Sequence, residues 1–304
     1  MARNRKKKES LVYQVQKCLE SELAIGESKS NDKAIEASRL REKKKGNSNA
    51  KLTFEERITI HKIYSWKTFR DYQHNCCTFV KWCKDKYNCK TLEECRPYVN
   101  EWITSLSEYS AYTQKAYVCA VAKLYNCTTM DFNPTPIRHR ADITRSRTEA
   151  KRDKNFSEAI NKEFIAFCKG TGLRKSELEC LRGDQLLFKN GHYYIAVTRG
   201  AKGGRYREAP IISDIHSIVI HIKKAGDGKV WDYVPDLDVH SYRSEYCCTI
   251  YRKYARPIEE IPKKERYICR GDLKGVIYDK KAMLIASQCL GHNRISVIAG
   301  HYLR

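Results

Sequence analysis

The fold class of this chain is decided by residues 193–212, which read YYIAVTRGAKGGRYREAPII. Two strand-like runs, 193–198 and 205–212, flank the glycine-rich turn 200–204, and this pattern predicts a β-hairpin. Segments with helical periodicity surround the hairpin, at 157–169, 175–182 and 215–224. The sequence therefore predicts a mostly helical chain with small β-hairpins, of the α+β class.

A second hairpin is expected inside residues 256–278. Its strands would be 266–270 and 276–278, on either side of Gly271-Asp272, and a helix over 280–290 would follow. We interpret 256–278 as an insertion within the second domain. The residues leave open a DNA contact, a subunit contact and an inert surface.

The rest of the chain divides by composition into four parts. Residues 1–50 contain the charged runs 3–8 and 39–45 and are interpreted as a basic N-terminal arm, either a solvated tail or an ordered DNA contact. Residues 51–130 carry the apolar spacing of four or five short helices. Residues 131–155, with Asn-Pro-Thr-Pro near their start, predict a linker, and 156–304 form the second domain.

The charge indicates a polyanionic partner. Lys and Arg total 58 against 36 Asp and Glu, which gives a net charge of +22, and 41% of the residues are hydrophobic. That apolar content is too high for a disordered chain. Nucleic acid is favoured over an anionic membrane surface, because the sequence shows no amphipathic basic helix or apolar anchor. No apolar run approaches the roughly 18 residues of a membrane span. No signal peptide is recognised, so a cytoplasmic location is expected.

Basic residues interleaved with aromatics in 51–130 suggest that this domain grips DNA phosphates. The alternative for each is a solvated face of an ordinary helical domain. The candidates are Lys62, Lys67, Arg70, Lys81, Lys115 and Lys123.

No metal or cofactor site is predicted. The 14 cysteines include no Cys-x-x-Cys pair, so we interpret most of them as buried apolar residues in a reducing compartment. The chain also lacks a Gly-x-x-x-x-Gly-Lys-Ser/Thr loop and a compact carboxylate cluster with metal-ligand spacing.

Five short motifs in the second domain indicate a catalytic site, and the evidence is the order in which they occur along the chain. Each has an ordinary explanation when taken alone, such as a surface ion pair, a solvated turn or a structural histidine. In chain order they are Arg174 with Glu177 in TGLRKSEL, Lys202 in the hairpin turn, His240-x-x-Arg243, Leu290-Gly291-His292, and Tyr302.

This order resembles that of the tyrosine recombinases, the phage-integrase family, and looks most like members carried by mobile elements. The resemblance covers residues 157–304 by motif, and 51–130 by size, position and pattern. It implies a helical core-binding domain and a mixed α/β catalytic domain that together form a C-shaped clamp on DNA. The implied activity is site-specific strand exchange through a covalent phosphotyrosine, for integration or excision of a mobile element.

The resemblance also implies residue roles that suit the chemistry. Arg174 and Arg243 would bind the non-bridging oxygens of the scissile phosphate, where guanidinium groups fork onto two oxygens. Tyr302 would attack phosphorus, and Lys202 would protonate the leaving 5′-oxygen. The further roles are assistance by His240 and His292 and the orientation of an arginine by Glu177. Because the phosphotyrosine conserves the bond energy, neither ATP nor a metal is expected.

The implied partners are double-stranded DNA, a homotetramer on two DNA sites and an accessory directionality factor. Three features depart from the family pattern. His240 and His292 are 52 positions apart, a long spacing that the 256–278 insertion explains. Tyr302 follows His292 by ten positions, one more than usual, and only two residues follow Tyr302. We therefore expect cyclic assembly either to use a surface other than an exchanged C-terminal tail or to be weaker.

Two other functions are compatible with the residues. A type IB topoisomerase uses a similar Arg, Lys, Arg, His and Tyr set, although His240-x-x-Arg243 and Leu290-Gly291-His292 favour the recombinase. A non-catalytic DNA-binding factor derived from a recombinase is the third interpretation, and the complete residue set disfavours it.

Overall fold

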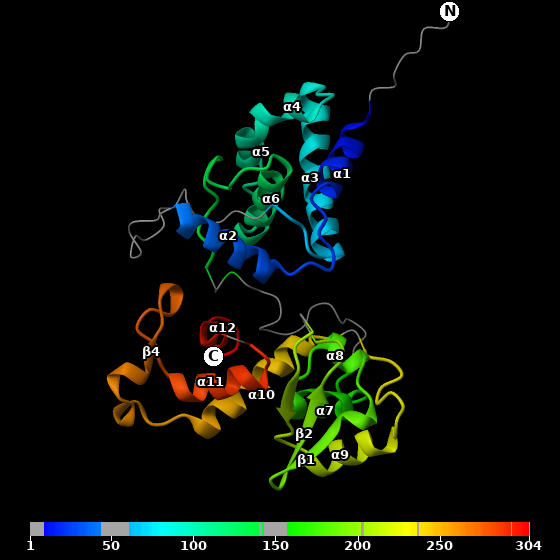
Figure 1. Ribbon diagram of the computed structural model, residues 1–304, viewed down its shortest axis with the longest axis vertical. Helices are drawn as coiled ribbons and strands as arrows, with labels where there is room; N and C mark the ends of the chain where they lie inside the picture. Colours follow the sequence, from blue (N-terminus) through cyan, green and yellow to red (C-terminus); the bar gives the residue numbers. More distant parts are fainter. Residues whose placement is uncertain are drawn as a thin grey trace, which may run out of the picture. The chain divides into compact units, whose positions relative to one another are not determined.

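A computed structural model of the 304-residue chain describes residues 9–43, 61–139, 142, 157–201, 204–235, 237–292 and 294–303. Contacts divide the chain into two compact units, Met1–Arg138 and His139–Arg304. The division falls inside the 131–155 stretch expected to be a linker. Figure 1 shows the helical first unit and the mixed second unit, each of which is considered separately here.

The first unit is built from helices around one core. Its longest helix, α3, begins after Ser65, whose side chain accepts a hydrogen bond from Thr68 N, and ends at Asn88 in the left-handed conformation. Large apolar side chains such as Phe79 and Trp102 fill the core. The helices are α1 (Leu11–Glu20), α2 (Lys29–Lys43), α3 (Trp66–Tyr87), α4 (Leu92–Cys95), α5 (Val99–Ser105) and α6 (Ala111–Leu124), with a 3-10 turn at Arg96–Tyr98.

Helix α1 belongs to this core, which differs from the separate arm expected over 1–50. Leu11, Val15 and Leu19 lie on one face of α1 at helical spacing and are buried in the same cluster as Phe79. Apolar burial thus joins this part of the chain to the helical unit. The charged residues at 3–8 and 44–45 lie outside the described residues.

The second unit combines six helices and five strands among its described residues, and the α+β class is confirmed. The helices are α7 (Lys162–Thr171), α8 (Lys175–Glu179), α9 (Ile215–Lys224), α10 (Val239–Tyr254), α11 (Lys280–Cys289) and α12 (Ile295–His301). The strands are β1 (Leu186–Lys189), β2 (His192–Val197), β3 (Arg207–Pro210), β4 (Arg266–Ile268) and β5 (Ile277–Asp279). Short 3-10 turns cover Gly183–Gln185, Ile258–Glu260, Lys263–Glu265 and Gly271–Leu273.

The first predicted hairpin forms two strands of a three-stranded antiparallel sheet in the order β1-β2-β3. The register pairs Tyr194 with Pro210 and Val197 with Arg207. Strand β1 was not anticipated, and β3 is shorter than the 205–212 run expected for it. The inner face of the sheet packs against α7 and α9 in one apolar cluster (Figure 1).

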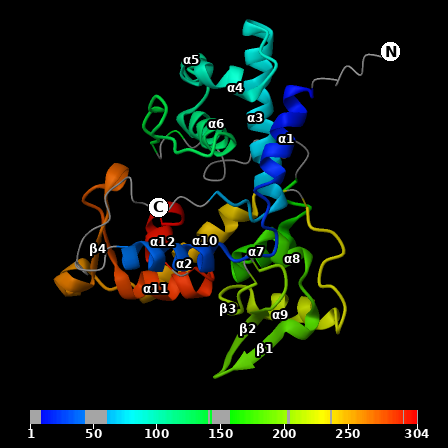
Figure 2. The ribbon, with the colours of Figure 1, turned by 45° about the horizontal axis from the view of Figure 1, so that its top comes forward.

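Helices α10, α11 and α12 form a second apolar cluster that includes Tyr246, Met283 and Ile298. The β4–β5 hairpin lies at the opposite end of the α10–α11 pair from the three-stranded sheet (Figures 1 and 2). Its register pairs Tyr267 with Tyr278. Helix α11 also contacts strand β3 of the three-stranded sheet.

The sequence predictions cover both the cysteines and the apolar character of the helices. All fourteen cysteines are free thiols, and eight of them are buried, as small apolar side chains would be. Among the helices in the described ranges, none has the length and apolar character needed to cross a bilayer.

Candidate active site

The start of helix α8 places Arg174 beside Glu177. Gly172 ends α7 in the left-handed conformation, with φ of 59°, and a Cβ there would collide with the Tyr246 ring. Arg174 is the N-cap of α8, and Glu177 lies one turn on. The Glu177 carboxylate accepts hydrogen bonds from Arg174 N at 2.7 Å and from Arg174 Nη1 at 2.6 Å.

A third residue, Arg207 on β3, completes this cluster. Its Nη1 and Nη2 donate to the two oxygens of Glu177 at 2.7 and 2.6 Å, and its Nε donates to Cys289 O at 3.1 Å. Burial of the 2% exposed Glu177 opposes ionisation, but the hydrogen bonds and charge of Arg207 outweigh it and lower the pKa of Glu177 to about 2. The carboxylate is therefore ionised at neutral pH.

The sequence analysis missed Arg207. The available signal was strand alternation, because Arg207 shares its side of β3 with the buried Ala209, one position from the exposed Tyr206. An arginine on the inward side of a strand needs a buried anionic partner. Glu177, 30 positions earlier, is that partner.

Arg243 lies on α10 and is 1% exposed. Its Nη1 donates to Gly172 O and its Nη2 to Leu290 O, while Nε donates to Tyr302 Oη at 3.3 Å. Arg174 Nη2 shares the Leu290 carbonyl at 3.2 Å. Burial and the nearby arginines lower the pKa of Arg243 to about 10, partly offset by Tyr302, so the group is still a cation at neutral pH.

Tyr302 is the C-cap of α12 and is the last residue of the site in chain order. It is 3% exposed, and its carbonyl accepts hydrogen bonds from Ser244 Oγ at 3.0 Å and Cys248 Sγ at 3.3 Å. Its Oη lies 3.1 Å from His292 Nε2. Burial, followed by the charge of Arg243, lowers the pKa of His292 to about 4, so the imidazole is neutral at pH 7.

Of the two remaining predicted residues, His240 is described by the structure and Lys202 is not. His240 is exposed on α10, and its ring centroid lies 5.2 Å from that of Tyr302. Lys202 lies outside the described residues. Its neighbour Gly200 is near α8, because Ser176 Oγ donates to Gly200 O at 2.9 Å, and a Cβ on Gly200 would collide with the Ser176 carbonyl.

The structure thus brings Arg174, Glu177, Arg243, His292 and Tyr302 together, with His240 at the edge. Within this cluster the guanidinium groups of Arg174 and Arg207 contact the Glu177 carboxylate, and the charge of Arg243 also acts on it. The described cluster therefore has three arginines and one carboxylate. The surplus of two positive charges favours a bound anion such as a phosphodiester.

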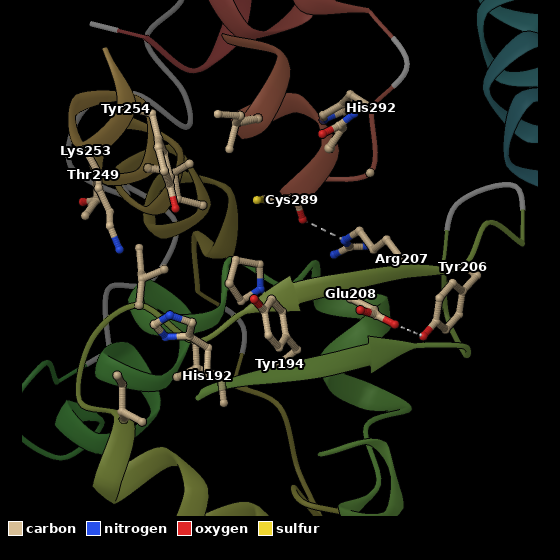
Figure 3. A pocket seen from close by; sticks show the side chains of 18 of the residues that line it. His192, Tyr194, Tyr206, Arg207, Glu208, Thr249, Lys253, Tyr254, Cys289 and His292 are labelled. Atoms are coloured by element: carbon tan, nitrogen blue, oxygen red, sulfur yellow. Dashed lines mark hydrogen bonds between the residues drawn. The ribbon is translucent and has the colours of Figure 1, made fainter. Parts of the chain in front are cut away.

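A pocket of about 770 Å³ lies behind this cluster, between the outer face of the sheet and helices α10 and α11 (Figure 3). His192 and Tyr194 line it on β2, and Lys253 lines it on α10. Arg207 and His292 also line the pocket, and Figure 3 shows the Arg207 guanidinium pointing at the main chain of Cys289.

Among the described residues, no group of three or more His, Cys, Asp or Glu side chains could hold a metal ion.

The six basic residues predicted to bind DNA differ in their surroundings. Lys67, Arg70 and Lys81 are exposed on α3. Lys62 pairs with Glu27 at 2.5 Å, and Lys115 donates to Thr129 Oγ1 at 2.9 Å.

Lys123 does not lie on the surface where a DNA contact was expected. Its side chain is 8% exposed, its Nζ is 3.9 Å from Glu22, and that Nζ has no hydrogen-bond partner among the described residues. Lys123 is partly buried on α6, between the buried Ala122 and Leu124. The expected surface contact by Lys123 therefore needs correction.

The fold is similar to that of solved site-specific recombinase structures. One matching structure is the XerH site-specific recombinase bound to a palindromic difH substrate in a post-cleavage complex, with a TM-score of 0.56 and 13% identity over 98% of this chain and 94% of that chain. The XerH pre-cleavage complex with difH gives a TM-score of 0.52 and 12% identity over 98% of this chain and 95% of that chain. No protein-family model and no curated protein matches the sequence.

Proposed function

We propose that this protein is a site-specific DNA recombinase that cleaves and rejoins strands through a 3′-phosphotyrosine at Tyr302, for integration or excision of a mobile element. The observation that carries the proposal is the position of the Tyr302 hydroxyl, 3.3 Å from Arg243 Nε and 3.1 Å from His292 Nε2, inside a cluster with surplus positive charge. The XerH fold supports the same activity class.

In the cleavage step, Tyr302 Oη forms a bond to phosphorus and the bond to the 5′-oxygen breaks. Arg174 and Arg243 stabilise the charge on the non-bridging oxygens in the transition state. The neutral imidazole of His292 accepts the phenol hydrogen bond as the proton leaves, with His240 nearby. Lys202 supplies the proton to the departing 5′-oxygen. Rejoining reverses these transfers and uses the energy of the phosphotyrosine ester.

The proposed substrate is double-stranded DNA held by both units as a clamp, with a homotetramer on two DNA sites and an accessory directionality factor. The exposed Lys67, Arg70 and Lys81 suit phosphate contacts in the first unit. Binding should weaken with salt by a log-log slope of about 0.9 per phosphate contacted. An affinity that does not change with salt contradicts this binding mode.

The direct test is covalent trapping on a nicked suicide DNA substrate. The cognate site is first found by selecting bound fragments from DNA flanking the gene. The wild-type chain should give a protein–DNA adduct that Tyr302→Phe abolishes, because phenylalanine has no nucleophilic oxygen. Tyr254→Phe, at an exposed position of α10, is the matched control and should still form the adduct. An adduct that persists in Tyr302→Phe overturns the assignment.

A further inference from the structure

We propose that Arg207 is a positioning residue of this site, which occupies both oxygens of Glu177 and thereby keeps Arg174 available to the scissile phosphate. The proposal rests on the recombinase function given above and adds a residue that the sequence motifs do not include.

Arg207 connects three segments that converge on the site. It lies on β3, contacts both Glu177 oxygens on α8 at 2.7 and 2.6 Å, and donates from Nε to Cys289 O at the end of α11 at 3.1 Å. The residue is 7% exposed, so water does not replace these bonds easily. One side chain therefore fixes the distance between the α8 start and the turn that carries Leu290 and His292.

Arg174 and Arg207 both donate hydrogen bonds to the Glu177 carboxylate, and the way they share it explains why Arg174 stays available to the phosphate. Guanidinium and carboxylate groups favour two parallel hydrogen bonds. Arg207 makes that two-point contact, whereas among the described contacts the Arg174 guanidinium reaches the carboxylate through Nη1 and turns Nη2 to Leu290 O. Arg174 is also the more exposed partner, with 21% of its side chain accessible against 6% for Arg207.

Loss of Arg207 would change both geometry and charge. The Glu177 carboxylate would then take Arg174 as its two-point partner and draw it away from the substrate. The surplus of the cluster would fall from two positive charges to one. Arg207 also packs against the turn before His292, because a Cβ on Gly291 would lie 2.8 Å from Arg207 Cδ.

The test compares cleavage with DNA binding in Arg207→Met. Single-turnover cleavage of saturating suicide DNA should fall by about 100-fold, as expected when a catalytic group is misplaced by about 1 Å. The Kd for the same DNA should stay within about threefold, because Arg207 is buried. Lys189→Met is the matched control, since it removes an exposed ion pair to Glu208 in the same sheet and should leave cleavage unchanged.

Two further variants keep the proposal falsifiable if Arg207→Met folds poorly. Arg207→Lys keeps the charge but cannot contact both carboxylate oxygens and Cys289 O together, so cleavage should fall by less than in Arg207→Met, with Kd unchanged. Glu177→Gln/Arg207→Met removes the unpaired buried carboxylate and should regain stability to urea without regaining cleavage. If the role of Arg207 were purely structural, the double variant would regain both stability to urea and cleavage.

The outcomes separate this proposal from the function on which it rests. Wild-type cleavage rates in folded Arg207→Lys, or full cleavage in the double variant, overturn the positioning role and leave the recombinase function intact. Persistence of the covalent adduct in Tyr302→Phe overturns the function itself. Loss of the adduct in Tyr302→Phe, together with slow cleavage and normal binding in the Arg207 variants, supports both.

Discussion

The second unit contains two clusters of arginines and carboxylates that differ in charge balance. In the 256–278 insertion and the start of α11, Arg256 and Lys281 face Asp279 and Glu265, so the charges cancel. At the candidate site, Arg174 and Arg207 contact Glu177 and the charge of Arg243 also acts on it, so three arginines are matched by one carboxylate among the described residues. The first cluster has no net charge, whereas the second has a net charge of two positive units.

The two carboxyl groups at the centres of these clusters, Asp279 and Glu177, have similarly lowered pKa values, although the clusters differ in net charge. Hydrogen bonds from Arg256 lower the pKa of Asp279 to about 2, and Arg207 does the same for Glu177 against the cost of burial. A low carboxylate pKa therefore does not identify the functional cluster. The charge balance distinguishes the two clusters instead, because at the candidate site the described cations outnumber the carboxylate.

The largest expected effect is that of Arg243→Lys at the site. Lysine cannot donate to Gly172 O, Leu290 O and Tyr302 Oη together, so cleavage should fall by about 10²- to 10³-fold. Arg252→Lys, on the exposed face of α10, is the control and should cleave normally. Single-turnover cleavage of suicide DNA measures both. Equal rates in the two variants would break the distinction between the clusters.

Arg256→Met tests the balanced cluster and should affect stability alone. Asp279 is fully buried and would lose the hydrogen bonds from Arg256 Nε and Nη2, at 2.7 and 2.9 Å. The urea midpoint should fall, whereas the cleavage rate per folded molecule should not change. A loss of cleavage in the fully folded variant would show that the insertion also serves the site.

The pH dependence of stability should depend on His292. Its pKa is lowered from 6.5 to about 4 in the folded chain, so between these values the unfolded chain binds a proton that the folded chain does not. Stability is therefore complete above pH 6.5 and falls as the pH drops toward 4, by up to about 1.4 kcal/mol per pH unit. His292→Gln should remove this part of the slope in urea titrations. An unchanged slope would mean that burial and the charge of Arg243 do not lower the pKa of His292 in the folded chain.

The smallest effect is expected from a pair of glycines with similar backbone angles. Gly291, at the site, has φ of 68°, and Gly271, in the insertion, has φ of 64°. Alanine at either position should cost about 1 kcal/mol in urea unfolding, because both lie in the left-handed region. A Cβ at Gly291 meets Arg207 Cδ at 2.8 Å, and one at Gly271 meets nothing within 4 Å. Cleavage should therefore fall severalfold in Gly291→Ala alone, and equal rates would argue against coupling through Arg207.

Several features were predictable because they depend on local patterns. The helix over 215–224 matches α9 residue for residue. The second hairpin pairs Arg266–Ile268 with Ile277–Asp279, close to the predicted strands 266–270 and 276–278. Turn glycines and apolar spacing determine such elements over short distances. Boundaries were less accurate where tertiary contacts extend or shorten an element, as in the short strand β3.

The sequence by itself determined the α+β class, the excess of positive charge and the order of the candidate residues from Arg174 to Tyr302. Only the tertiary structure decided which charges are buried and paired. Arg207 and Lys123 are both basic residues on regular elements, yet one holds Glu177 and the other lies against Glu22 in a helical core. The physical reason is that desolvation and ion pairing depend on partners from distant segments, which local sequence patterns do not reveal.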